Sequence, residues 1–328
     1  MRTAVKRHET PGSDRRWTQG PVWAQEAAAL ARKRPRGLLS IFGACIACAV
    51  SGRREHVPTS DEYPDTVIRR ISFKAGGGLG WRISALHTPR AEPAPWKIVV
   101  VTGAPSWAEY WAPVMAALPQ DREMVVVDRP GFANSEPLHC VPKIETQAKA
   151  LLPLLEPAPG QRILLAGQSY GAAISTLMAA SRPDQTAGLV LVSGYFGKSG
   201  KTARFLIELG SKVAGLIPRD LRHAVLEASG QPRQLNPVFR LLNSFPFLIT
   251  IIHGDKDDFA PIDVARAIAD TTLAPARFIE IRGGNHFLND CEPEQVIAWL
   301  EAAIGGRGGL RQVRPLTASE QAALSLAS

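Results

Sequence analysis

Cysteine is scarce in this sequence, and clusters of metal-ligating residues are missing. The 328 residues include four cysteines. Cys45 and Cys48 have the C-x-x-C spacing of a redox motif, but they lie inside an apolar stretch and not at a strand–helix turn, so redox chemistry is not expected. Cys140 and Cys291 are either a pair that joins in an oxidising compartment or two small buried residues. Internal repeats are also absent, and the sequence predicts no metal and no organic cofactor.

The greater part of the chain also lacks any excess of charge. The formal net charge is +8, but residues 1–54 hold eleven Lys and Arg against three Asp and Glu. Residues 55–328 hold 27 of each kind and are therefore neutral. Since the basic residues are concentrated in the N-terminal segment, nucleic-acid binding by the remainder is not expected.

The basic N-terminal segment is laid out like a signal peptide. Basic residues run to Arg36, an apolar stretch extends from Gly37 to Val50, and small residues close it at Ala47-Cys48-Ala49. The apolar stretch is short for a membrane span, and its cysteines loosely resemble a bacterial lipoprotein cleavage site. We therefore expect residues 1–54 to direct export or anchoring on the periplasmic side of a membrane. The alternative is a disordered cytoplasmic extension.

Strand and helix patterns alternate from residue 65 to 305. The strands are expected at 67–73, 81–87, 96–102, 124–128, 163–166, 188–193, 248–253 and 277–281, and the helices at 107–118, 144–155, 171–180, 262–272 and 294–304. This alternation predicts an α/β fold with a doubly wound, mostly parallel sheet. In such sheets, functional sites form at the carboxyl ends of the strands.

Residues 198–245 interrupt this alternation with helices and loops only. Because they stand between two strands, they are expected to form a small helical lid over the carboxyl ends of the strands. Beyond the domain at 65–305, residues 306–328 follow a glycine-rich stretch and are expected to form a flexible tail.

Ser169 lies in Gly167-Gln168-Ser169-Tyr170-Gly171, between the strand at 163–166 and the helix at 171–180. A serine in such a sharp strand-to-helix turn is lifted above the sheet. Gly167 and Gly171 are expected there because the turn needs positive φ and close backbone approach. A serine hydroxyl is a poor nucleophile until a base takes its proton, so the chain should also supply a base, an acid and oxyanion donors.

Candidates for the base and the acid follow the last two strands. His286 comes after the strand at 277–281 and two glycines, which allow the loop to bend the imidazole back over the sheet edge. Asp255, Asp257 and Asp258 all follow the preceding strand, and a carboxylate from this loop would orient the histidine.

These segments together resemble the α/β-hydrolase fold superfamily over residues 65–305. The matching motifs are the serine turn, Asp128-Arg129-Pro130-Gly131-Phe132-Ala133-Asn134-Ser135, His253-Gly254-x-x-Asp257-x-x-x-Pro261 and Gly284-x-His286-Phe287. The order Ser, Asp, His is the one that this scaffold imposes. The resemblance selects Asp257 as the acid over Asp255 and Asp258.

The loop after the third strand departs from the superfamily. Members usually carry His-Gly there, whereas this chain has Thr102-Gly103-Ala104-Pro105-Ser106. By position, the Ala104 and Tyr170 N–H groups would form the oxyanion hole, since Pro105 has no N–H. Thr102 removes a loop-stabilising histidine but no backbone donor, and so activity is expected to survive.

The resemblance implies a serine hydrolase that cleaves a carboxylic ester or lactone through an acyl-enzyme. Hydrolysis of a C–C bond or an amide, or acyl transfer, would use the same triad. A non-catalytic ligand-binding protein is a third reading, but such a protein need not keep all three catalytic residues. Apolar residues within 202–217 and 245–247 favour an apolar small-molecule substrate.

Overall fold

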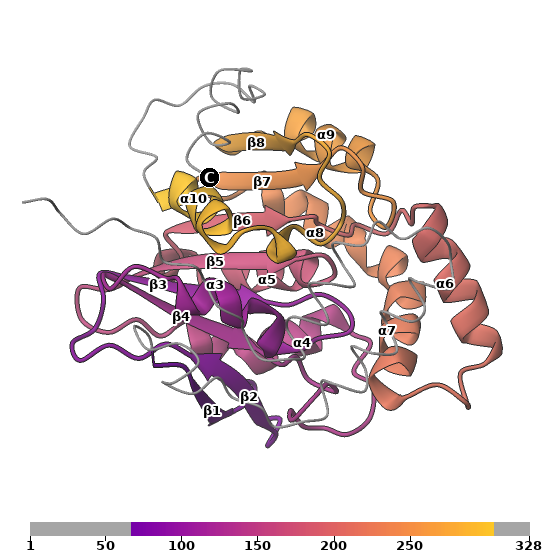
Figure 1. The fold of residues 1–328 in the computed structure, drawn as a ribbon, viewed down its shortest axis with the longest axis horizontal. Coiled ribbons are helices and arrows are strands. Elements are labelled where there is room, and N and C mark those ends of the chain that lie inside the picture. The colour runs from indigo at the N-terminus through magenta and orange to yellow at the C-terminus, as the bar shows by residue number, and fades with distance from the viewer. Residues whose placement is uncertain (1–66, 305–328) are drawn as a thin grey trace, which may run out of the picture.

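A single mixed sheet organises residues 67–304, the part of the chain that the computed structural model describes. Its strands are β1 (Arg69–Lys74), β2 (Arg82–His87), β3 (Trp96–Val101), β4 (Arg122–Val127), β5 (Arg162–Gln168), β6 (Gly188–Val192), β7 (Ile249–Gly254) and β8 (Ala276–Ile281). They lie in the order β1-β2-β4-β3-β5-β6-β7-β8 (Figure 1). β2 is antiparallel to β1 and β4, and all other neighbours are parallel. The carboxyl ends of β3 to β8 therefore share one edge of the sheet.

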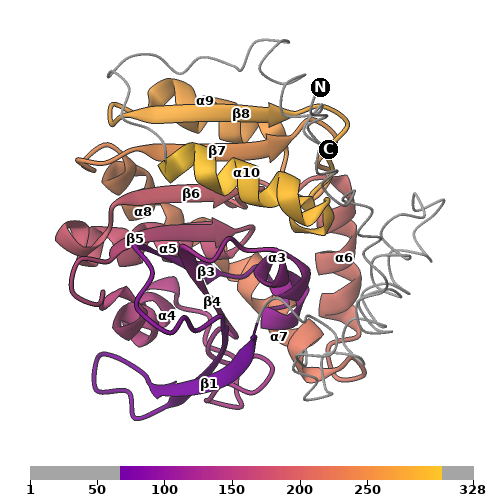
Figure 2. The same cartoon turned by 60° about the vertical axis from the view of Figure 1, so that its left-hand side comes forward.

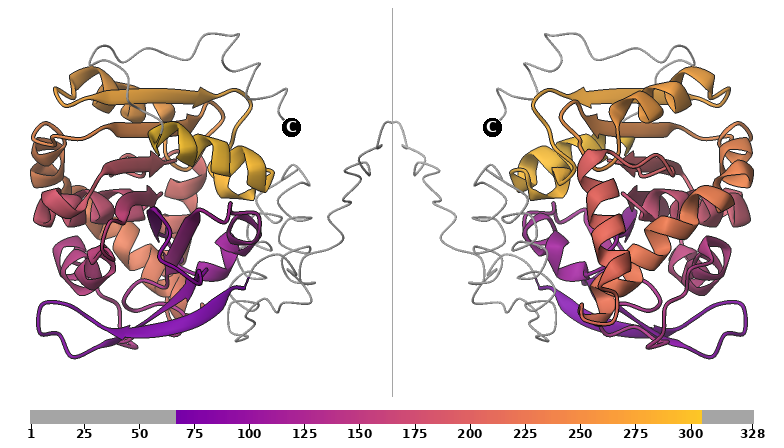
Figure 3. Two further views of the ribbon diagram at one scale, coloured as in Figure 1. Left: turned by 90° about the vertical axis from the view of Figure 1, so that its left-hand side faces the viewer. Right: turned by 90° about the vertical axis from the view of Figure 1, so that its right-hand side faces the viewer.

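Helices cover both faces of this sheet. The α-helices of the described residues are α3 (Ala112–Ala116), α4 (Ile144–Leu151), α5 (Gly171–Ser181), α6 (Lys201–Lys212), α7 (Arg219–Gly230), α8 (Leu235–Leu242), α9 (Ile262–Thr271) and α10 (Pro293–Ile304). One apolar core lies under α4, α5, α8 and α9, and a second lies under α3 and α10 on the opposite face (Figures 2 and 3). Burial on both faces explains why the parallel strands read as nearly continuous apolar runs.

The predicted α/β fold and the positions of the strands are confirmed, whereas two of the helices are shorter than expected. The helices predicted at 107–118 and 144–155 are each divided into an α-helix and a 3-10 turn. Pro113 lies in the first turn of α3, and Pro153 in the first turn of the 3-10 helix that follows α4. A proline lacks the N–H that a continuing helix needs, so each of the two marks a new helical start.

The segment at 198–245 contains α6, α7 and α8 and connects β6 to β7. α6 and α7 stand beyond the carboxyl ends of the strands (Figure 1, and Figure 3, right). The Trp107 indole N–H donates to the Asp220 carboxylate of α7 across 2.8 Å, which ties α7 to the loop after β3. The predicted role of the segment as a lid over the carboxyl ends of the strands stays a prediction.

The predictions for residues 1–54 and 306–328 lie outside the described residues. Within 67–304, no helix is both long and apolar enough to cross a membrane. Cys140 and Cys291 are free thiols, so the structure agrees with the alternative in which they do not pair. Burial raises the pKa of Cys140 to about 12 and that of Cys291 to about 11.

Candidate active site

The loops after β3 and β5 lie against each other at the carboxyl edge of the sheet. β3 pairs with β4 on one side and β5 on the other, which makes this the point where the strand order reverses. Parallel pairing sets Val101 beside Gly167. A Cβ on Gly103 would lie 3.0 Å from the Cβ of Ser169. The backbone after β3 is therefore in contact with the serine turn.

Ser169 adopts a left-handed backbone conformation, with φ of 50°. Its N–H donates to the carbonyl of Val192 across 2.9 Å, and its own carbonyl accepts the N–H groups of Ala172 and Tyr195 at 3.1 and 3.0 Å. A residue other than glycine seldom adopts this conformation and keeps it only where its surroundings hold it. Three backbone hydrogen bonds provide that support here.

The two glycines of the turn are needed for space and not for positive φ. Neither Gly167 nor Gly171 has a left-handed backbone, so the expectation of positive φ at these positions is wrong. A Cβ on Gly167 would lie 2.1 Å from Oγ of Ser175, and one on Gly171 would lie 2.2 Å from the carbonyl oxygen of Val101. The expectation of close backbone approach is confirmed, and the positive φ falls on the serine itself.

His286 connects Ser169 to Asp257. Its Nε2 lies 2.9 Å from Oγ of Ser169, and its Nδ1 lies 2.8 Å from Oδ2 of Asp257. Ser169 is partly exposed, whereas Asp257 and His286 are buried. The structure thus brings together the three side chains that the sequence nominates, from the loops after β5, β7 and β8. Such a chain of contacts can activate a hydroxyl as a nucleophile.

Asp257 is surrounded by donors that favour its ionised form. Its Oδ1 accepts the N–H groups of Phe259 and Ala260 at 2.9 and 2.8 Å, and its Oδ2 lies 3.2 Å from Nε2 of His253. Burial alone would raise the pKa of Asp257. The attraction of His286 and the hydrogen bonds of both histidines outweigh burial and hold that pKa well below its usual range. An ionised Asp257 keeps the proton of His286 on Nδ1, which leaves Nε2 as the acceptor.

The other two carboxylates of this loop make different contacts. Asp255 accepts the N–H of Gly283 at 2.7 Å and so ties the loop after β7 to the loop after β8. Asp258 is hydrogen-bonded to the hydroxyl of Thr202 on α6. Neither contact involves His286, and the geometry therefore agrees with the choice of Asp257.

Two phenylalanine rings enclose the imidazole of His286. The ring of Phe259 stacks on it with centroids 5.1 Å apart, and the ring of Phe287 meets it edge-on at 5.5 Å. Phe287 is 41% exposed, so an apolar surface lies at the outer side of the histidine.

The two nominated oxyanion donors flank Ser169. Tyr170 follows the serine directly, and Ala104 follows Gly103, which is in contact with it. Among residues 67–304, the N–H groups of Ala104 and Tyr170 have no hydrogen-bond acceptor. Both N–H groups are therefore free to bind a ligand atom, and their role in an oxyanion hole stays a prediction.

Thr102 stabilises the loop after β3 despite the absence of the usual histidine. Its hydroxyl is hydrogen-bonded to the hydroxyl of Ser106 and lies 3.1 Å from the carbonyl of Val127. The Ser106 hydroxyl also accepts the N–H of Arg129 at 2.9 Å. The expected loss of a loop-stabilising side chain is therefore compensated by two hydroxyl groups.

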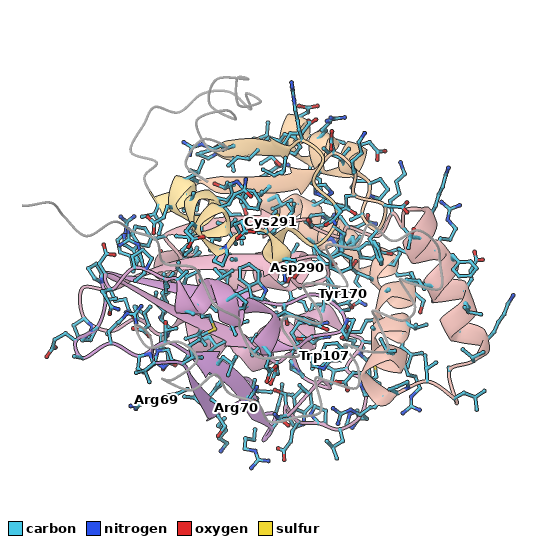
Figure 4. All side chains as sticks on the ribbon, viewed as in Figure 1. Arg69, Arg70, Trp107, Tyr170, Asp290 and Cys291 are labelled. Atoms are coloured by element: carbon cyan, nitrogen blue, oxygen red, sulfur yellow. The ribbon has the colours of Figure 1, made fainter. Side chains whose placement is uncertain are left out.

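Sequence reasoning missed a buried ion pair next to this loop. Arg129 and Glu227 are both fully buried, and the Nη2 of the arginine lies 2.9 Å from a carboxylate oxygen of Glu227. The guanidinium also lies over the ring of Tyr170, 4.9 Å from its centroid. Tyr170 and Trp107 lie toward the end of the sheet that is nearest to α7 (Figure 4). The sequence signal was Arg129 in the motif at 128–135, but its partner lies 98 residues away.

Within the described part of the chain, no three His, Cys, Asp or Glu residues are placed to hold a metal ion together.

Comparison with known proteins matches the central part of the chain to one family. A family model described as the alpha/beta hydrolase fold matches residues 97–231, which include Ser169. The putative carbamate hydrolase RutD of Klebsiella pneumoniae (strain 342) is 35% identical over 121 residues, 35% of this chain and 46% of that protein. The chain thus spans about half the length of the curated relatives that it matches.

Solved structures extend the likeness to most of the chain. A thermophilic esterase from Thermogutta terrifontis superposes with a TM-score of 0.56 and 19% identity, covering 72% of this chain and 99% of that one. The 2-hydroxy-6-oxo-6-phenylhexa-2,4-dienoate hydrolase of Rhodococcus sp. strain RHA1 gives a TM-score of 0.57 and 15% identity, covering 73% and 99%. At these identities the likeness is one of fold.

Proposed function

Since the chain has the α/β-hydrolase fold, we propose that it is a serine hydrolase that cleaves a carboxylic ester or lactone through an acyl-enzyme. One observation carries the proposal: the imidazole of His286 lies within hydrogen-bond reach of both the Ser169 hydroxyl and the Asp257 carboxylate. The family match and the esterase-like fold support a hydrolytic reaction.

The proposed reaction begins with attack by Ser169. Nε2 of His286 takes the hydroxyl proton while the serine oxygen adds to the substrate carbonyl carbon. Asp257 stabilises the imidazolium that forms. The Ala104 and Tyr170 N–H groups donate to the carbonyl oxygen as it becomes negative. Collapse of the tetrahedral intermediate expels the alcohol, which receives the proton from His286.

Hydrolysis of the acyl-enzyme repeats the same steps with water. Nε2 of His286 takes a proton from water, the hydroxide adds to the acyl carbon, and the same N–H groups stabilise the second oxyanion. The proton then returns to Oγ of Ser169 as the carboxylic acid leaves. No step requires a metal ion or an organic cofactor.

The surroundings of His286 favour an apolar substrate. Phe259 and Phe287 enclose the imidazole, and the outer ring is 41% exposed. A leaving group that accepts the proton from Nε2 would lie near these rings. Contact with the rings removes apolar surface from water, which stabilises the binding of an apolar group.

Amide or carbamate cleavage is the second candidate, because the matched relatives are named as putative carbamate hydrolases. The same triad can attack either carbonyl, but an amine leaving group depends more strongly on protonation by His286. Rates on matched esters, amides and carbamates with the same acyl group would separate the two. A higher kcat/KM for the carbamate would reject the ester assignment.

Replacement of Ser169 by Ala tests the catalytic assignment directly. We expect turnover of p-nitrophenyl esters to fall by about 10⁵-fold or more because the nucleophile is removed. The matched control is Ser175→Ala, which removes a hydroxyl from α5, the helix that follows Ser169; that hydroxyl donates to the carbonyl of Ala172 at 3.0 Å. This control should keep most of the activity.

A fluorophosphonate probe provides the second readout. It should label the unmodified protein and the Ser175→Ala variant at Ser169, and it should not label Ser169→Ala. If the probe does not react and esters are not turned over, the chain is a binding protein and the proposed function is wrong.

A further inference from the structure

The guanidinium of Arg129 is bound to the backbone after β3. Its Nη2 donates to the carbonyl of Gly103 at 2.8 Å, and its Nε lies 2.9 Å from the carbonyl of Thr102 and 3.2 Å from that of Gly103. Arg129 itself is fully buried. It therefore holds two successive carbonyl groups in the loop that contacts Ser169.

The remaining N–H groups of Arg129 bind two acidic or amide side chains, Gln147 and Glu227. Nη1 donates to Oε1 of Gln147 at 2.6 Å and to Oε1 of Glu227 at 3.0 Å, and Nη2 donates to Oε2 of Glu227 at 2.9 Å. Gln147 and Glu227 are fully buried as well. The planar fork of an arginine fits this set of acceptors, whereas a lysine ammonium cannot reach all of them at once.

The peptide bond between Gly103 and Ala104 links this network to the candidate oxyanion hole. It is trans, so its carbonyl and its N–H point in opposite directions. Arg129 fixes the carbonyl of Gly103 and thereby fixes the direction of the Ala104 N–H. The same guanidinium lies over the ring of Tyr170, the residue that carries the other donor. One side chain thus contacts Tyr170 and the Gly103 carbonyl, which belongs to the same peptide group as the Ala104 N–H.

We propose that Arg129 is a positioning residue for the oxyanion hole and that Glu227 of α7 holds it in place. The proposal rests on the proposed serine hydrolase function. Neither side chain touches the reacting atoms. The helical segment between β6 and β7 contributes to catalysis through Glu227, because an undocked α7 would leave the guanidinium without its counter-charge. A misplacement of the oxyanion donors by about 1 Å is enough to lower the rate by about 100-fold.

Arg129→Lys tests this role, because lysine keeps the charge but loses the fork. We expect kcat to fall by about 100-fold, with KM changed by less than about threefold. The matched control is Arg122→Lys, which breaks the two-pronged pair of Arg122 with Glu301 at the other end of β4. This control should keep kcat within about threefold of the unmodified protein.

Inhibitor binding separates positioning from general damage. An alkyl boronic acid forms a tetrahedral adduct on Ser169 and places an oxygen in the oxyanion hole, whereas the product carboxylate binds without that adduct. Arg129→Lys should weaken binding of the boronic acid by about the same factor by which kcat falls. The affinity for the product carboxylate should change by less than about threefold. A kcat no lower than that of Arg122→Lys, or equal weakening of both inhibitors, would overturn the proposal.

Two further measurements decide the outcome if Arg129→Lys does not fold or if the protein has no esterase activity. Glu227→Gln keeps the shape of the carboxylate and removes its charge. It should lower kcat and weaken boronic acid binding, each by about tenfold. Amide hydrogen exchange in residues 102–106 needs no activity. It should be faster in Arg129→Lys or Glu227→Gln than in Arg122→Lys, and unchanged exchange would overturn the proposal even if the serine hydrolase assignment fails separately.

Discussion

Two histidines of this chain each lie 2.8 Å from a carboxylate, one at either edge of the sheet. At the amino edge of β4, Nε2 of His87 meets Glu123, and at the carboxyl edge Nδ1 of His286 meets Asp257. The first pair is partly exposed, with 22% and 14% of the two side chains accessible, while the second has 8% and none. Only the second histidine has its other ring nitrogen on a hydroxyl, that of Ser169.

The two ends of β4 also differ in the burial of an arginine–glutamate pair. Arg122, at the first residue of the strand, binds Glu301 of α10, and Arg129, two residues beyond its end, binds Glu227 of α7. The first pair has 14% and 32% of its side chains exposed, whereas the second has none. The chemical pairs are alike, but at the carboxyl edge each is buried and has a third partner in the candidate site. A pair of interacting residue types therefore does not identify a site by itself. The position of the pair at the carboxyl ends of the strands is what distinguishes the candidate site.

The largest difference between the two edges is expected from replacing each carboxylate that binds a histidine. Asp257→Asn should lower kcat by about 10³- to 10⁴-fold, because an amide can hold His286 in the wrong tautomer and does not stabilise the imidazolium. Glu123→Gln should leave kcat within about threefold, since Glu123 and His87 lie at the amino end of β4, away from Ser169. Steady-state kinetics on one ester would measure both, and equal losses would remove the contrast between the edges.

A smaller but clear difference is expected in the free energy of unfolding. Glu227→Ala leaves Arg129 buried without its counter-charge and should cost about 3–5 kcal/mol. Glu301→Ala opens a partly exposed pair and should cost about 0–1 kcal/mol. Urea unfolding of the two variants beside the unmodified protein measures both values. A loss at Glu301 as large as that at Glu227 would contradict the view that burial sets the difference.

The smallest expected effect is on the pH dependence of stability. Burial alone would raise the pKa of Asp257, but His286 and the hydrogen bonds outweigh it, so its native pKa lies below the ordinary value of 3.8. The unfolded chain then binds more protons in acid, and the stability from this group is complete above about pH 5 and lost as the pH falls below 4. Unfolding free energies between pH 6 and pH 3 should therefore fall less steeply in Asp257→Asn than in the unmodified protein. Parallel curves would show that Asp257 is not held ionised by its partners.

Much of the fold could be predicted from the sequence because the buried strands have a local signal. Each parallel strand is an apolar run bounded by turn residues, and the run is readable without knowing its neighbours. Helix ends were less accurate at Pro113 and Pro153. There the sequence period continues, but the missing N–H ends one helix and starts another.

The three residues that meet at the candidate site were also accessible from sequence. Each lies in a loop that follows a strand, and the family resemblance selected Asp257 from the three aspartates of its loop. The pair of Arg129 and Glu227 was not accessible from sequence. The arginine is visible in the motif at 128–135, but Glu227 is one acid among several in a helical segment whose orientation no local pattern gives. The positive φ at Ser169 was likewise assigned to the wrong residues, Gly167 and Gly171. The sequence shows where the glycines lie, but it does not show whether each is needed for its backbone angle or for space.

The three nominated side chains depend on different strands of the sheet. His286 lies in the loop after β8, and among the described strands β8 pairs only with β7 at the end of the sheet. If β8 were not paired, the imidazole of His286 would not be held beside the Ser169 hydroxyl. Of the three nominated side chains, His286 is thus the one whose position depends on the pairing at the end of the sheet.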